Sequence, residues 1–188
     1  MINRELKILF IHPERTGGTT AQNYLGGVTN SIHPHHHATL REYREKYPEA
    51  GEYYVFMTIR CPQRRVESYQ QYQQAQGRSS SIGDAIRALG AKRYKYYAQG
   101  RKVNCLLTEF LDYDLPILGE AFGIPRREVR RANAREYPVV DWTNQDRADL
   151  LQYLRSDIEL YEEALERRST EGYIVPRGMR TNAFSKSI

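Results

Sequence analysis

The clearest structural pattern in the chain is KILFIHPERTGGTT, residues 7–20. Its first part, Lys7 to Ile11, is a continuous apolar run, which is typical of a buried parallel strand in the middle of a sheet. The pair Gly17-Gly18 then forms a turn, and Thr19 or Thr20 can cap the helix that follows. A strand, a glycine turn and a helix in this order present backbone N–H groups and the positive end of a helix to one point. The stretch therefore predicts an anion-binding loop.

Strands and helices alternate along the rest of the chain. Apolar runs predict two more strands, at 53–59 and 103–107, and caps or apolar periodicity predict helices at 40–46, 62–76, 82–89, 114–122 and 143–165. On the last helix the expected core stripe comprises Leu150, Leu151, Leu154, Ile158, Tyr161 and Leu165. We expect one α/β domain over residues 1–168, with a P-loop-like parallel sheet flanked by helices, and a polar tail over 169–188. Ligands should then bind beyond the carboxyl ends of the strands.

The composition is that of a globular protein with a basic surface. Of the 188 residues 40% are hydrophobic and 27% are charged, and the net charge is +5, mainly from arginine. Arginine suits forked contacts with phosphate or sulfate oxygens, but charge does not choose between a nucleotide, a nucleic acid and a sulfated glycan. Cys61 and Cys105 lack a paired spacing, so we expect free thiols. The first apolar run is too short to span a membrane and no signal peptide is evident, which predicts a cytoplasmic protein.

The side chains of the first loop also suit an anion. Thr16, Thr19 and Thr20 add hydroxyl donors to the backbone amides, and Arg15 adds a fixed positive charge. A plain strand-to-helix turn is the structural alternative. A nucleoside triphosphate loop needs a lysine before its magnesium-binding hydroxyl, and that lysine is missing. The second strand ends at Arg60 rather than at an aspartate, which also weakens the kinase interpretation.

A second unusual stretch, RCPQRRVESY at residues 60–69, follows the second predicted strand. If a helix begins at Pro62, Arg65 and Ser68 lie three residues apart on one face, and Arg60 lies in the turn beside them. Such a turn can hold a second anion. For Arg65 an ion pair with a structural role is the alternative.

These two loops resemble those of the sulfotransferases that use 3'-phosphoadenosine 5'-phosphosulfate (PAPS), particularly the heparan sulfate 2-O- and 6-O-sulfotransferases and their small bacterial and viral relatives. In that family the first loop typically reads P-K-T-G-G-T-S/T and the second R-x-P-x-x-R-x-x-S. Here Glu14-Arg15 stands where Pro-Lys is usual. The resemblance implies that the first loop binds the 5'-phosphosulfate and that Arg60 and Ser68 bind the 3'-phosphate. The implied PAPS-binding set is Arg15, Thr16, Gly17, Gly18, Thr19, Thr20, Arg60 and Ser68.

The resemblance also implies two catalytic residues. In the family the loop lysine is thought to assist the departing oxygen, but an arginine hardly ever gives up its proton. We therefore assign Arg15 to electrostatic stabilisation of that oxygen. The residues from His37 to Glu42 resemble the family's histidine at the start of a helix, which is the catalytic base in the heparan sulfate enzymes. A neutral imidazole can accept a hydroxyl proton near pH 7, so His37 is the expected base.

The loop also contains His33, His35 and His36. One of these would be the base if the family's histidine aligns with it instead of with His37. A metal site is a weaker interpretation of the cluster because no carboxylate or cysteine ligand is near in sequence, and we expect no metal. The sequence thus predicts a sulfotransferase that moves a sulfuryl group from PAPS to a hydroxyl acceptor and releases adenosine 3',5'-bisphosphate. The acceptor, a carbohydrate, a small-molecule alcohol or a protein tyrosine, stays open, as does the oligomeric state.

Two alternatives come from other classes. One is a nucleotide or small-molecule kinase, which would bind ATP with magnesium. The other is a protein that binds nucleotides or nucleic acid without catalysis. The basic cluster Arg126, Arg127, Arg130 and Arg131 bears on the second alternative, but a solvated helix face is the simpler interpretation. A nucleic-acid partner is therefore not expected, nor is a membrane.

Overall fold

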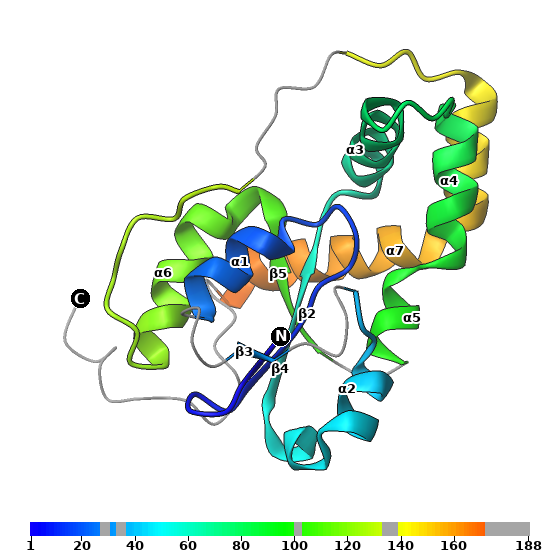
Figure 1. Ribbon diagram of the computed structural model, residues 1–188. Coiled ribbons are helices and arrows are strands. Elements are labelled where there is room, and N and C mark those ends of the chain that lie inside the picture. Colours follow the sequence, from blue (N-terminus) through cyan, green and yellow to red (C-terminus); the bar gives the residue numbers. More distant parts are fainter. Residues whose placement is uncertain (27–30, 33–36, 100–102, 133–138, 172–188) are drawn as a thin grey trace.

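The computed structural model (Figure 1) describes residues 1–26, 31–32, 37–99, 103–132 and 139–171. Within them a single sheet has the order β3-β1-β2-β4-β5. Its strands are β1 (Ile2–Asn3), β2 (Ile8–Ile11), β3 (Ser31–Ile32), β4 (Tyr54–Ile59) and β5 (Asn104–Leu107). All three predicted strands are present as β2, β4 and β5, and they are parallel to one another.

The sheet is nevertheless mixed, so the expectation of a parallel sheet is wrong at one edge. β1 pairs antiparallel with both β2 and β3. Strands of two residues are too short to show a periodic pattern, which is why the sequence does not reveal them. β2 still lies in the middle of the sheet, with all four of its residues buried.

Helices flank the sheet, as predicted. They are α1 (Gly18–Leu25), α2 (Leu40–Lys46), α3 (Pro62–Ala75), α4 (Ile82–Ala91), α5 (Tyr94–Ala98), α6 (Leu111–Ala121) and α7 (Asn144–Glu171), with 3₁₀ turns η1 (Pro48–Glu52) and η2 (Thr108–Phe110). Thr39 caps α2 through a capping box with Glu42, and Pro62 is the first residue of α3. The ambiguous region 93–97 is the helix α5. α6 begins three residues earlier than expected and runs through Pro116.

Two apolar cores lie on opposite faces of the sheet, and a third lies beside it. Ile8 and Phe10 of β2 pack with α1 and α6, whereas Leu9 and Ile11 pack with α2, α5 and α7. Both faces are covered, which explains the continuous apolar run of β2. The third core joins α3, α4 and the first part of α7 in a unit that projects from the sheet in Figure 1.

The long helix α7 buries only part of the predicted stripe: Leu154 is buried, and Leu150 and Tyr161 are partly buried against the cores. Its backbone is non-helical at Leu154, where the helix is kinked, and this changes the face that each half presents. Leu151 and Leu165 are 57% and 39% exposed, whereas Asp157 and Ala164 are buried. The helix continues to Glu171, past the predicted boundary of the tail at 168, and residues 172–188 lie outside the described residues.

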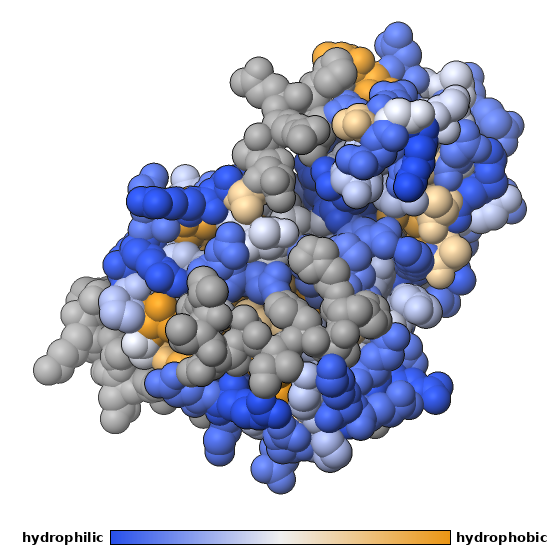
Figure 2. Space-filling model, in the orientation of Figure 1, coloured by the Kyte–Doolittle hydropathy of each residue, from blue (hydrophilic) through white to orange (hydrophobic). Residues whose placement is uncertain are grey.

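These elements form a single α/β domain. Figure 2 shows that the coloured part of one face is mostly hydrophilic, with hydrophobic residues in small separate patches. Among the described helices none is both long enough and apolar enough to cross a membrane.

Candidate functional site

Both predicted anion loops line one cleft, with a volume of about 630 Å³, at the carboxyl ends of β2 and β4. All nine candidate residues contribute to its walls: Arg15, Thr16, Gly17, Gly18, Thr19, Thr20, His37, Arg60 and Ser68. The fold brings them together because the strands that carry the two loops are adjacent and parallel. The cleft also contains residues outside the predicted set, including His12, Gln73, Arg78, Lys92, Thr108 and Arg131.

The first loop ends in an uncapped helix. Gly17 is the N-cap of α1, in the left-handed region with φ 70°, and no side chain caps the helix. α1 therefore begins at Gly18, and Thr19 and Thr20 lie in its first turn rather than at the cap. The first N–H groups of a helix have no partner within it, so this end can donate to an anion in the cleft. Arg15 also has a left-handed backbone, with φ 63°.

Position 18 must be a glycine because the His12 ring lies against its backbone. A Cβ atom built on Gly18 would lie 1.9 Å from Cδ2 of the His12 ring, and His12 is itself buried. Gly18→Ala should therefore lower the free energy of unfolding by about 1–3 kcal/mol, because the ring or the loop must move. Gly51→Ala is the matched control, since nothing lies within 4 Å of its Cβ position. Urea denaturation measures both, and equal stability of the two variants would contradict the packing described.

The hydroxyl groups of two of the three threonines make hydrogen bonds within the protein. The Thr16 hydroxyl is buried, donates to the Pro13 carbonyl at 2.8 Å and lies 2.8 Å from the Thr58 hydroxyl. Its only proton is thus used inside the protein, which corrects its expected role as a hydroxyl donor to an anion. Thr20 Oγ1 accepts from the Ala132 N–H at 3.0 Å. Thr19, which is half-buried, lines the cleft as expected.

The two loops contact each other through Arg15. Its Nε donates to Ser68 Oγ at 3.1 Å, and its guanidinium lies 4.9 Å from the centre of the Tyr72 ring. In return, a guanidinium nitrogen of Arg60 lies 3.5 Å from the Arg15 carbonyl oxygen. Just after β5, Thr108 Oγ1 lies 2.6 Å from the Thr16 carbonyl oxygen and 2.8 Å from that of Ile59, and its one proton is shared between them, which connects the first loop to the end of β4. The two expected anion positions are therefore neighbours in one cleft.

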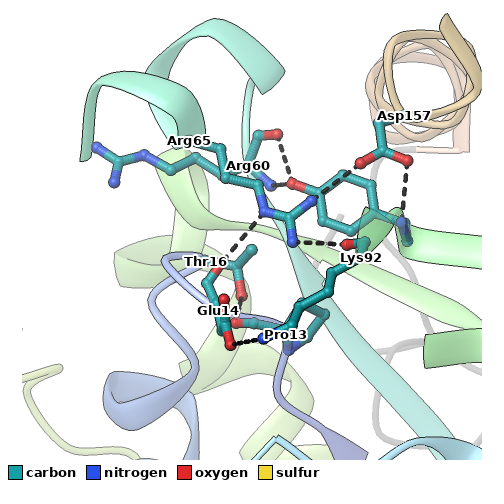
Figure 3. A network of polar contacts seen from close by, with 8 residues as sticks. Pro13, Glu14, Thr16, Arg60, Arg65, Lys92 and Asp157 are labelled. Atoms are coloured by element: carbon teal, nitrogen blue, oxygen red, sulfur yellow. Dashed lines mark hydrogen bonds and ion pairs between the residues drawn. The ribbon is translucent and has the colours of Figure 1, made fainter. Parts of the chain in front are cut away.

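Arg65 stabilises the cleft from behind (Figure 3). It is fully buried and pairs with Asp157 at 2.9 Å, with its guanidinium over the Tyr94 ring. Its other nitrogens donate to the carbonyls of Glu14 and Lys92, each at 3.1 Å. The structural alternative for Arg65 is therefore correct.

Asp157 reaches the second loop as well. Its second carboxylate oxygen accepts from the Tyr94 N–H at 2.9 Å, and the Tyr94 hydroxyl bonds both the N–H and the carbonyl of Arg60. Burial raises the pKa of Asp157 to about 6, and the Arg65 charge opposes that shift, so the carboxylate is ionised at pH 7. The sequence did carry a signal, because Asp157 falls between Leu154 and Tyr161 at helical spacing, which is an acidic residue on an apolar face.

The hydrogen bond of His37 fixes the tautomer of its neutral ring. Its Nδ1 lies 2.8 Å from the carbonyl oxygen of His12, and a carbonyl can only accept. Nδ1 therefore carries the proton of the neutral ring, and Nε2 carries the basic lone pair. The ring also packs edge-on against His12, with 5.0 Å between the centroids. His33, His35 and His36 lie outside the described residues, and within the described part no three potential metal ligands cluster.

Comparisons of this chain with known protein families, with curated proteins and with solved structures find no match. The resemblance to the sulfotransferases therefore rests on the sequence motifs alone.

Proposed function

We propose that the protein is a PAPS-dependent sulfotransferase with a P-loop-like nucleotide site. The observation that carries this proposal is the meeting of two anion loops in one cleft, where Arg15 Nε lies 3.1 Å from Ser68 Oγ. The 5'-phosphosulfate would bind at the uncapped end of α1, and the 3'-phosphate at Arg60 and Ser68. A ligand with one anionic group would use only half of this arrangement.

The chemistry requires a base on one side of the sulfuryl group and positive charge on the other. His37 Nε2 takes the proton of the acceptor hydroxyl as its oxygen attacks sulfur, and the bond from sulfur to the 5'-phosphate oxygen breaks. The electron pair of that bond leaves with adenosine 3',5'-bisphosphate. Arg15 and the amides of the first loop stabilise the charge that develops there. The acceptor is a carbohydrate or a small-molecule alcohol.

The charges of the cleft favour sulfuryl transfer over a kinase reaction. Among the described residues that line it, Glu14 is the sole carboxylate, and Lys92 pairs with it at 2.6 Å. Magnesium prefers carboxylate and water oxygens, whereas the arginines here suit sulfate and phosphate directly. The proposed reaction needs no metal. The free thiols of Cys61 and Cys105 suit a reducing compartment, in line with a cytoplasmic location.

Ligand-dependent thermal shifts test the proposal. Adenosine 3',5'-bisphosphate should raise the melting temperature, because a ligand that binds only the native state stabilises it, and ATP with magnesium should have little effect. Arg60→Ala should weaken binding of the bisphosphate by about tenfold or more, and leave that of adenosine 5'-monophosphate within about twofold. Stabilisation by ATP with magnesium alone would favour the kinase, and equal weakening of both nucleotides would remove Arg60 from the 3'-phosphate site.

A further inference from the structure

Lys92, which belongs to neither loop motif, contacts the first loop directly. It lies between α4 and α5, 78 residues from Glu14 in sequence, and its Nζ donates to Glu14 Oε1 at 2.6 Å. Both side chains line the cleft, and Figure 3 shows the lysine extended along it toward Glu14. Lys92 is therefore a cation in the wall of the same cleft as Arg15.

The backbones of both partners are held as well. Arg65, buried and paired with Asp157, donates to the carbonyl oxygens of Glu14 and Lys92 at 3.1 Å each. One guanidinium thus keeps the two chain segments side by side. The Lys92 side chain is 49% exposed and that of Glu14 is 17% exposed, so the pair is open to water at its lysine end, and such pairs add little to stability. Stability alone therefore does not account for a pair that is fixed in this way at the cleft.

The charges point to a role in binding an anion. An unpaired Glu14 carboxylate in the anion loop would repel a phosphate or sulfate group. An ammonium has three N–H donors, and the contact with Glu14 uses one of them. The hydrogen bond to Glu14 also raises the pKa of Lys92, which keeps the ammonium charged. Lys92 can therefore neutralise Glu14 and donate to a ligand at the same time.

We propose that Lys92 is a ligand-binding residue that acts together with the first loop, oriented by Glu14 so that its ammonium contacts the 5'-phosphate end of the nucleotide. This inference rests on the proposed function, because it assumes that the first loop holds that end. It adds a residue from a distant segment to the site, and it assigns Glu14 a positioning role.

Calorimetric titrations with three nucleotides test this inference. Lys92→Met should lower the affinity for adenosine 5'-monophosphate and for adenosine 3',5'-bisphosphate about tenfold. It should change the affinity for adenosine 3'-monophosphate by no more than about twofold. Lys95→Met is the matched control, since Lys95 is exposed on α5 and is not part of the cleft wall. It should leave all three affinities nearly unchanged. An equal loss for the 3'-monophosphate, or no loss for the other two, would overturn the assignment.

A variant without the Glu14 charge distinguishes two roles of Lys92: direct contact with the ligand and neutralisation of Glu14. When the protein already carries Glu14→Gln, adding Lys92→Met should still lower the affinity for the bisphosphate about fivefold or more. If its effect disappears there, Lys92 acts only by cancelling the Glu14 charge, and the proposed contact is wrong. Failure of the wild-type protein to bind the bisphosphate would overturn the proposed function as well. Normal wild-type binding that is lost in Arg60→Ala but unchanged in Lys92→Met would overturn this inference alone.

Discussion

Replacing His37 with glutamine should lower kcat by about 10²–10⁴-fold, the usual contribution of a positioned general base. Glutamine can still donate to the His12 carbonyl, as Nδ1 does at 2.8 Å, but it has no basic nitrogen in place of Nε2. The rate is measured as formation of adenosine 3',5'-bisphosphate from PAPS, with an acceptor found in a panel of sugars and phenols. The affinity for the bisphosphate should stay within about twofold, because a base is not needed for binding.

The pH profile distinguishes a base from a residue that only shapes the cleft. Wild-type kcat should rise with pH as the base loses its proton, and the variant should lack this rise. His35→Gln and His36→Gln address the other registers of the histidine loop. If His37→Gln keeps full activity while one of these two loses it, the role of base passes to that residue.

Asp157→Ala should lower the free energy of unfolding by about 3–5 kcal/mol, because it leaves the guanidinium of Arg65 buried without its counter-charge. Both side chains are 1% exposed, so water cannot replace the missing partner. The Tyr94 N–H loses its acceptor as well. Urea denaturation at pH 7, where the carboxylate is ionised, measures the effect. Binding of adenosine 3',5'-bisphosphate should weaken too, since this pair supports the Glu14 backbone.

Two further variants show whether the buried charge is the cause. The double variant Arg65→Met with Asp157→Leu should be more stable than the sum of its single changes implies, because it leaves no charge behind. Glu45→Ala breaks the exposed pair with Arg41 and should leave stability nearly unchanged. If Asp157→Ala were as mild as Glu45→Ala, the pair with Arg65 would not hold the loops in place.

Local sequence signals predicted the elements well where geometry depends on near neighbours. The cap of α2 at Thr39 and the start of α3 at Pro62 follow from the chemistry of single turns, and both were confirmed. The first residue of α1 was missed because Gly17, with its left-handed backbone, begins the helix without a side-chain cap. β1 and β3 were missed because each has two residues, which is too few to show an alternating pattern. The predicted stripe of α7 was right for Leu154 but wrong for Leu151 and Leu165, because a periodic pattern assumes a straight helix and α7 is kinked.

The candidate site shows the same division. All nine predicted residues line one cleft, because each lies in a loop that follows β2 or β4, in the start of the helix after that loop or, for His37, just before a capped helix. Their hydrogen-bond partners were not predictable: Arg15 contacts Ser68 across 53 positions, and Arg65 contacts Asp157 across 92. Such pairs depend on how strands and helices pack, and no local pattern records that.

The sequence by itself therefore determined the three longer strands, most of the helices and the two loops that follow β2 and β4, since these follow from periodicity and turn chemistry within a few residues. Only the tertiary structure decided which donors point into the cleft. It turned the Thr16 hydroxyl inward to Pro13 and Thr58, buried Arg65 behind the loops and placed Lys92 against Glu14. The reason is physical: a buried donor or charge must find a partner, and the packing of distant segments determines which partner is within reach.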